Sequence, residues 1–277
     1  LLPPIREGAP ATRVVALGGD KTHRANVSPT ELAADLALLL PNGESRLYEP
    51  GQPLPGWLAE IGVKNAAIVP LVAGGTTAGA LVVTNRLTDV SEFEEEDRRH
   101  SPPQDAVLFI GSSSIRKWSE LAADFPDIQV IHRGFGGSGI SDCTFYLDRI
   151  VIPYRPRMIV LYAGENDIAG GRTAGQVFED YKEFVTRASQ ALPRTRIAYI
   201  SLKPSPSRVQ HMAAFQQANE LIRRYAAAHQ RLSYIDVFTN MLGPDGRPRL
   251  ELFVADGLHL NRKGYELWTI LIADHLK

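Results

Sequence analysis

The sequence predicts an α/β protein: a domain with a parallel sheet between two layers of helices, preceded by a smaller α+β segment. Two observations lead to this prediction. Short apolar, β-rich runs alternate with amphipathic helical patterns through the later part of the chain, and such an alternation is typical of a parallel sheet covered on both faces. A charged stretch with two prolines separates this part from an earlier region that carries a hairpin signal.

Composition narrows the class of protein before any element is assigned. Of 277 residues, 44% are hydrophobic and 22% are charged, as in an ordinary globular protein. The net charge of −1 gives no general attraction to nucleic acid, and no apolar run reaches the roughly 18 residues that span a bilayer. The single cysteine, Cys143, excludes an internal disulfide, and the first residues do not resemble a signal peptide. We therefore expect a cytoplasmic protein without nucleic-acid partners or membrane insertion.

The first part of the chain carries the signals of a small α+β segment. Residues 28–40, SPTELAADLALLL, begin with N-cap candidates and continue as an apolar helix. Residues 66–86 contain two β-rich runs on either side of a glycine pair, which predicts a β-hairpin. Further on, SEFEEEDRRHSPPQD combines a charge run with two prolines and indicates a helix that ends in a linker. We therefore predict a first segment over 1–99, a linker over 100–105 and a second domain over 106–277.

The second domain alternates strands and helices. The predicted strands are the apolar runs at residues 107–110, 128–131, 158–163, 196–201 and 233–238. The predicted helices cover residues 176–192, 211–230 and 262–276. The first of these helices has an apolar face at helical spacing, formed by Val177, Tyr181, Phe184, Val185 and Ala188.

Polar loops follow the predicted strands. Ligands of open parallel sheets bind beyond the carboxyl ends of the strands, so these loops are the candidates for chemistry. Their sequences are GSSS, HRGFGGSG, GENDIAGG, LKPSPS and, further on, ADGLHLN. Nearly all of their residues are Gly, Ser, Asn, Asp or His, which indicates a polar site at this edge of the sheet.

A serine in the first loop becomes a nucleophile only if a base removes its proton, usually a histidine that a carboxylate orients. Five of the seven histidines lie in or at predicted helices or outside the sheet domain, namely His23, His100, His211, His229 and His275. His132 and His259 remain. His259 follows Asp256 by three residues, a spacing that lets the carboxylate reach the imidazole. Taken alone, the same pattern is typical of a capping aspartate beside a surface histidine.

Together the loops resemble the sequence blocks of the SGNH hydrolases, the GDSL-type esterases and lipases. GSSS stands where the family has Gly-Asp-Ser-Leu, RGFGGS resembles its glycine block, AGEND its Gly-x-Asn-Asp block and DGLHLN its Asp-x-x-His block, in that order over roughly residues 105–277. The resemblance implies a flavodoxin-like fold and an esterase that hydrolyses small-molecule esters with acetyl or other short acyl groups. It implies no cofactor.

The resemblance also assigns roles to single residues. Its nucleophile falls on Ser113, its base on His259, and the carboxylate that orients the base on Asp256. The oxyanion donors that it implies are the backbone N–H groups of Ser113 and Gly137 and the side-chain amide of Asn166. These residue types suit the task, because glycine lets the backbone approach a ligand closely. In isolation, Gly137 would be interpreted as a loop hinge and Asn166 as a turn residue.

Three positions depart from the family pattern or adjoin its nucleophile. Ser112 stands where the family usually has aspartate, and Ser114 where it has leucine. We expect both serines to cap the following helix or to bond the loop backbone. His132 lies near a position where many relatives have asparagine, so the hydrogen bonding of the glycine block should differ. No departure removes a residue with a catalytic role.

Other interpretations use the same loops. Residues 134–139, GFGGSG, match the dinucleotide fingerprint G-x-G-x-x-G, although that fingerprint normally follows the first strand of its unit. Glu165 and Asp167 could form a glycosidase carboxylate pair, although residues two apart point in different directions. No cluster of His, Cys and Asp has metal-ligand spacing.

The first segment resembles part of a GAF domain over about residues 28–99. The matching stretches are IVPLVAGGTTAGALVVTNR and the acidic helix start FEEED. GAF modules bind small ligands or dimerise, but this copy is short at its front. We therefore expect an incomplete module that serves as a scaffold, a lid or a homo-oligomer contact. The alternative is a ligand-binding regulatory protein, in which the GAF-like segment is functional and the hydrolase domain is regulated or degenerate.

Overall fold

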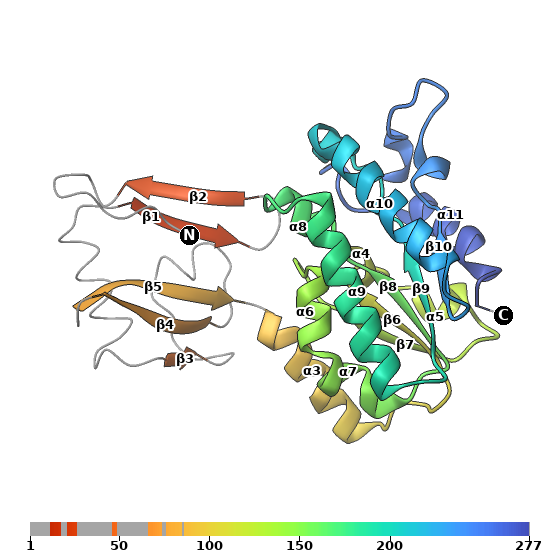
Figure 1. Cartoon of the computed structure of the whole chain (residues 1–277), viewed down its shortest axis with the longest axis horizontal. Coiled ribbons are helices and arrows are strands. Elements are labelled where there is room, and N and C mark those ends of the chain that lie inside the picture. Colours follow the sequence, from red (N-terminus) through yellow and green to blue (C-terminus); the bar gives the residue numbers. More distant parts are fainter. Residues whose placement is uncertain are drawn as a thin grey trace. The chain divides into compact units, whose positions relative to one another are not determined.

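The structure is a computed structural model that describes residues 12–17, 21–26, 46–48, 66–73, 76–84 and 86–276. By its internal contacts the chain divides into two units, Leu1–Thr88 and Asp89–Lys277. Figure 1 shows their elements in the order of the chain. In the described part of the chain, no helix combines the length and the apolar character needed to cross a bilayer.

The described elements of the first unit are antiparallel strands. Strands β1 (Thr12–Leu17) and β2 (Lys21–Asn26) pair with each other, and β3 (Arg46–Tyr48), β4 (Ala66–Ala73) and β5 (Thr76–Thr84) form a second sheet in that order. The pairing of β4 with β5 confirms the hairpin predicted over residues 66–86. The helix predicted over residues 28–40 lies outside the described residues, and the GAF-like assignment remains a prediction.

Helix α3 (Arg86–Arg99) belongs, from Asp89 on, to the second unit. The Asp89 carboxylate accepts a hydrogen bond from the backbone N–H of Gly136 at 3.0 Å. Near the other end of the helix, Asp97 pairs with the buried guanidinium of Arg133. The contacts therefore divide the chain before Asp89, ahead of the expected linker at residues 100–105. The charge run predicted a helix that ends in a linker, and two carboxylates of that helix, Glu94 and Asp97, pair with Arg149 and Arg133 of the sheet domain.

The second unit contains a five-stranded parallel sheet in the order β10-β9-β8-β6-β7. Its strands are β6 (Val107–Gly111), β7 (Val130–Gly134), β8 (Met158–Tyr162), β9 (Arg196–Ile200) and β10 (Leu232–Ile235). This is the flavodoxin-like strand order, so the structure confirms the predicted fold class. The strand order reverses at β6, which has β7 on one side and β8 on the other, and ligands of such sheets bind beyond the strand ends at that point.

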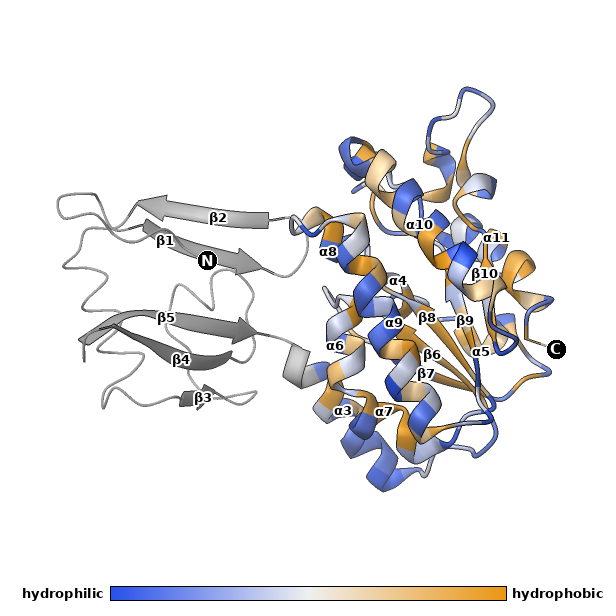
Figure 2. Cartoon of the chain, viewed as in Figure 1, coloured by the Kyte–Doolittle hydropathy of each residue, from blue (hydrophilic) through white to orange (hydrophobic). Residues whose placement is uncertain are grey.

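Two layers of helices cover the sheet (Figure 1). One layer consists of α3, α6 (Ile140–Phe145), α7 (Leu147–Ile150), α9 (Ala174–Ala191) and α10 (Met212–Ala227), and the other of α4 (Ser113–Arg116), α5 (Leu121–Asp124) and α11 (Arg262–Ala273). Alternate residues of β6 point into the two cores. Leu108 and Ile110 pack in the core under the first layer, and Val107 and Phe109 pack in the core under the second. Figure 2 shows the strands as predominantly hydrophobic, whereas α9 and α10 also carry hydrophilic residues.

The predicted elements are present, with shifted ends. Helices α9, α10 and α11 stand where helices were predicted, and every residue of the predicted apolar face of α9 is buried. Strand β10 ends at Ile235 instead of residue 238, because the backbone N–H groups of Val237 and Phe238 donate to the hydroxyl of Ser201 rather than to a neighbouring strand. Strand β7 runs on to Gly134, paired with Gly111.

Candidate active site

The end of strand β6 places Ser113 at the start of a helix. Gly111 has a φ of +148°, and a Cβ there would lie 1.9 Å from the carbonyl oxygen of Tyr162, so only glycine fits. The chain then turns sharply out of the sheet, and the N–H of Ser112 donates to the same carbonyl at 2.9 Å. Ser113 is the first residue of α4 and is partly exposed.

Of the two roles predicted for the neighbouring serines, capping of the helix or a bond to the loop backbone, the structure contradicts the first for Ser112. Ser112 occupies the N-cap position of α4, but its side chain makes no capping bond. Its carbonyl accepts from the N–H groups of the next turn instead, and α4 is only one turn long. Ser114 is buried, and its carbonyl accepts a hydrogen bond from the Tyr265 hydroxyl at 2.9 Å. The two serines therefore support the turn that carries Ser113.

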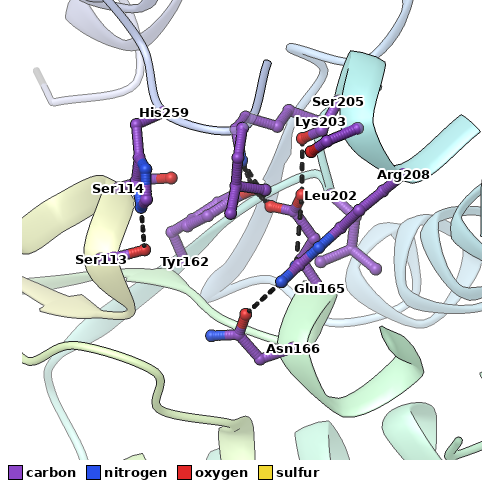
Figure 3. Close-up of polar contacts among 12 residues, drawn as sticks. Ser113, Ser114, Tyr162, Glu165, Asn166, Leu202, Lys203, Ser205, Arg208 and His259 are labelled. Atoms are coloured by element: carbon purple, nitrogen blue, oxygen red, sulfur yellow. Dashed lines mark hydrogen bonds and ion pairs between the residues drawn. The ribbon is translucent and has the colours of Figure 1, made fainter. Parts of the chain in front are cut away.

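A chain of hydrogen bonds joins Ser113, His259 and Asp256. Nε2 of His259 lies 3.0 Å from Oγ of Ser113, and Nδ1 lies 2.6 Å from Oδ2 of Asp256. Figure 3 shows the contact between the serine and the histidine. The other oxygen of Asp256 accepts the backbone N–H groups of Leu258 at 2.8 Å and of His259 at 2.9 Å. The structure thus brings together the predicted nucleophile, base and carboxylate across 146 residues of sequence.

The hydrogen bonds hold Asp256 as an anion. Burial by itself opposes ionisation, but the bonds from the His259 ring and from the two backbone N–H groups outweigh it, and they lower the pKa of Asp256 to about 2. An ionised carboxylate accepts from Nδ1–H, so Nε2 carries the lone pair that faces the serine hydroxyl. The Asp256 side chain is 45% exposed and the His259 side chain 16%, so the site is open to solvent.

Two of the three predicted oxyanion donors, Gly137 and Asn166, lie at the ends of the strands on either side of β6, and the third, Ser113, follows β6 itself. Asn166 is the second residue of α8 (Glu165–Ala169), which follows β8, and Gly137 lies in the loop after β7 with a φ of +69°. Because β7, β6 and β8 are adjacent and parallel, their carboxyl ends meet at one edge of the sheet. The amide nitrogen of Asn166 donates to the carbonyl of Ser138 at 3.1 Å. That bond links the two loops.

A buried polar cluster beside Asn166 was not predicted. Lys203 Nζ and the Tyr162 hydroxyl lie 2.5 and 2.6 Å from Oε2 of Glu165, and Oγ of Ser205 lies 2.5 Å from Oε1 (Figure 3). Arg208 adds an ion pair of 3.4 Å to the same carboxylate. The sequence carried one signal, the polar residues that follow β8 and β9. Their pairing depends on the adjacency of those two strands.

The competing interpretations of the strand-end loops find no support in the geometry. Glu165 contacts Lys203, whereas the carboxylate of Asp167 packs against Gly139, so the two acids do not share a site. In the GFGGSG stretch, the carboxylate of Asp142 accepts the N–H of Gly139 at 2.7 Å, where it would repel a dinucleotide phosphate. Among the described residues, no group of three His, Cys, Asp or Glu side chains could hold a metal ion.

Asp167 gives a testable prediction for stability. Burial raises the pKa of this carboxyl to about 6, helped by the carboxylates of Asp180 and Asp142, and its Oδ2 is buried without a partner among the described residues. The folded protein therefore holds a proton that the unfolded chain releases near pH 4, so the free energy of unfolding falls by on the order of 2–3 kcal/mol as the pH rises through this window.

Asp167→Asn should remove this contribution. We expect the difference in unfolding temperature, variant minus wild type, to become more positive between about pH 4.5 and about pH 8, measured by thermal denaturation. Asp127→Asn, at an exposed position, is the matched control and should show a constant difference. A constant difference for Asp167→Asn as well would contradict the prediction.

The fold and the site define an α/β protein in which a serine, a histidine and an aspartate are joined by hydrogen bonds beyond the strand ends of an open parallel sheet. The family model of the GDSL-like lipase/acylhydrolase family matches residues 110–267. The chain therefore belongs to the GDSL-like lipase/acylhydrolase family.

Individual relatives agree with the family match. Platelet-activating factor acetylhydrolase IB subunit alpha1 of Homo sapiens is 29% identical over 181 residues, which are 61% of this chain and 73% of the relative. Among solved structures, a GDSL-like lipase from Bacteroides thetaiotaomicron is similar with a TM-score of 0.58 at 21% identity, covering 68% of this chain and 96% of that one. A lipase/acylhydrolase from Enterococcus faecalis is similar with a TM-score of 0.52 at 21% identity, covering 62% and 97%.

Proposed function

We propose that the protein is a serine esterase that hydrolyses carboxylic esters with short acyl groups, from acetyl to butyryl. One observation carries the proposal: Ser113, His259 and Asp256 form an unbroken chain of hydrogen bonds at the strand ends. This arrangement activates a serine hydroxyl at neutral pH, because the imidazole accepts the proton and the carboxylate stabilises the resulting cation. Family membership supports the same reaction class.

The reaction has two stages. Oγ of Ser113 attacks the ester carbonyl while its proton moves to Nε2 of His259, and the tetrahedral oxyanion accepts hydrogen bonds from the N–H groups of Ser113 and Gly137 and from Nδ2 of Asn166. When the intermediate collapses, the C–O bond to the alcohol breaks and His259 returns the proton to the leaving oxygen. Water then attacks the acyl-serine by the same route and releases the acid.

The composition of the loops supports a short acyl group. The loops that follow the strands are short and rich in glycine, serine and proline, so they offer little apolar wall to a long chain. Neither the surface hollow along residues 242–251 nor the one beside helix α3 is lined by a triad residue. The human relative is named as an acetylhydrolase, which agrees with this choice of substrate.

An acyl-length series tests the proposal. With nitrophenyl esters from acetyl to palmitoyl, kcat/KM of the purified protein should be highest between acetyl and butyryl. A buried methylene contributes about 0.8 kcal/mol only where an apolar wall receives it. Efficient hydrolysis of the palmitoyl ester would contradict the short-chain assignment, and no hydrolysis of any ester would contradict the esterase itself.

A truncated chain tests whether the first unit supplies part of the acyl pocket. The truncation should remove residues 1–85 and so keep the whole of α3, because Asp89 and Asp97 on that helix pair with the sheet domain. We expect the acyl preference to stay unchanged, as for a scaffold or oligomer contact. A marked shift of preference would show that the first unit forms part of the pocket.

A further inference from the structure

The side-chain amide of Asn166 is held by two partners that fix its orientation. Arg208 donates from its guanidinium to Oδ1 at 3.0 Å, and the carbonyl of Ser138 accepts from Nδ2 at 3.1 Å. A guanidinium has only donors and a carbonyl only accepts, so the reverse orientation of the amide would lose both bonds. Nδ2 carries two hydrogens. Ser138 takes one, and the other can be presented to a ligand.

Arg208 is itself fixed in place. Its side chain is 2% exposed, and NH1 lies 3.4 Å from Oε1 of Glu165. Lys203, Ser205 and Tyr162 hold that carboxylate from other directions. Burial opposes ionisation of Glu165, but the charges of Lys203 and Arg208 outweigh it and keep its pKa below the ordinary value. The guanidinium that donates to Asn166 is therefore itself paired with an ionised, buried carboxylate, that of Glu165 (Figure 3).

The segment that carries Arg208 also contacts the loop of the histidine and the aspartate. Arg208 lies in the 3-10 helix η2 (Pro206–His211), and the N–H of Ser207 donates to the carbonyl of Gly257 at 3.0 Å. Gly257 directly follows Asp256 and has a φ of +62°. The segment after β9 thus joins the proposed oxyanion donor on one side to the triad loop on the other.

We propose that Arg208 is a positioning residue of the oxyanion hole, which orients and polarises the Asn166 amide so that an Nδ2 hydrogen faces the developing oxyanion. The proposal rests on the proposed esterase function. A cation at the amide oxygen draws electron density from the nitrogen and makes its N–H a stronger donor. A donor fixed before the reaction needs no reorganisation in the transition state. Arg208 acts only through Asn166.

Two variants of Arg208 test this role. Arg208→Lys keeps the charge but replaces the planar fork by a single ammonium, and Arg208→Gln removes the charge. We expect kcat to fall by about 10- to 100-fold in both, with KM changed less than about threefold. The matched control is Arg133→Lys, because Arg133 is also buried and paired with a carboxylate, Asp97. The control should lower the unfolding temperature and leave kcat unchanged.

A double-mutant cycle separates positioning from a general structural effect. Asn166→Ala should lower kcat by about 10²- to 10³-fold, as expected for the loss of one oxyanion donor. If Arg208 acts through Asn166, adding Arg208→Gln to Asn166→Ala should lower kcat by less than about threefold more. Full additivity of the two losses would overturn the proposal, as would an Arg208 variant with wild-type kcat.

A third variant leaves Arg208 intact and covers the case in which its variants do not fold. In Asn166→Asp, the new carboxylate would lie against the guanidinium, so its pKa, measured by carbon-13 NMR, should fall below the ordinary value of about 3.9. An ordinary or raised pKa would show that the contact is absent and overturn the proposal. Wild-type protein without esterase activity refutes the proposed function, and this inference with it. Active wild type with unaffected Arg208 variants refutes the inference alone.

Discussion

Ser113→Ala should abolish ester hydrolysis, lowering kcat by on the order of 10⁶-fold. The alanine variant has no hydroxyl to attack the carbonyl, and the histidine has no proton to accept, so only the oxyanion donors and substrate binding would still contribute. Ser113 is partly exposed, and among the described residues its side chain hydrogen-bonds to His259, so the unfolding temperature should change little. Steady-state kinetics with an acetyl ester, together with thermal denaturation, measure both expectations.

The adjacent serines are natural controls for this experiment. Ser112→Ala and Ser114→Ala keep the backbone bonds with which these residues support the turn, the N–H of Ser112 to Tyr162 and the carbonyl of Ser114 to Tyr265. Both variants should retain measurable activity. A fluorophosphonate should label the wild-type protein at Ser113 alone, as read by peptide mass spectrometry. An adduct on another serine, or an active Ser113→Ala protein, would refute the assignment of the nucleophile.

His259→Ala should cost about as much, on the order of 10⁶-fold in kcat, because serine and base act as one unit. The base must be neutral to accept the proton. Activity of the wild-type protein should therefore fall with acid through a single ionisation in the range where histidine side chains take up protons, about pH 5–8. Asp256 adds no second ionisation there, since its pKa of about 2 keeps it charged throughout that range.

The pH-rate profile of the wild-type protein should have a defined shape, which a variant of another histidine should share. A group that must be deprotonated gives a rate that rises with pH and then levels off, so the profile should have one limb on the acid side. His229→Ala is the matched control, because His229 is exposed, lies just after α10, and its Nδ1 contacts the carbonyl of Tyr225 on that helix. Its profile should match that of the wild type. A flat wild-type profile between about pH 5 and 8 would exclude a histidine base.

Much of the fold could be predicted from local patterns. The apolar face of α9 was predicted because side chains that recur at helical spacing share one face, and that face is buried in the structure. The strands were predicted because fully buried parallel strands are continuous apolar runs. The ends of the strands could not be predicted in this way. Val237 and Phe238 are apolar and lie just beyond β10, yet their N–H groups donate to the Ser201 hydroxyl and do not pair with a neighbouring strand.

The loops of the candidate site and the local pair Asp256 and His259 could be predicted from the sequence, because groups three residues apart can meet in a single turn. The resemblance to SGNH hydrolases then singled out one serine of three. Three contacts could not be predicted from the sequence: His259 with Ser113, the carboxylates of α3 with the sheet domain, and Arg208 with Asn166. These contacts join segments that are far apart in the sequence and are brought together by strand order and helix packing. A local sequence pattern specifies which residues are near one another along the chain, but not which distant segments come into contact.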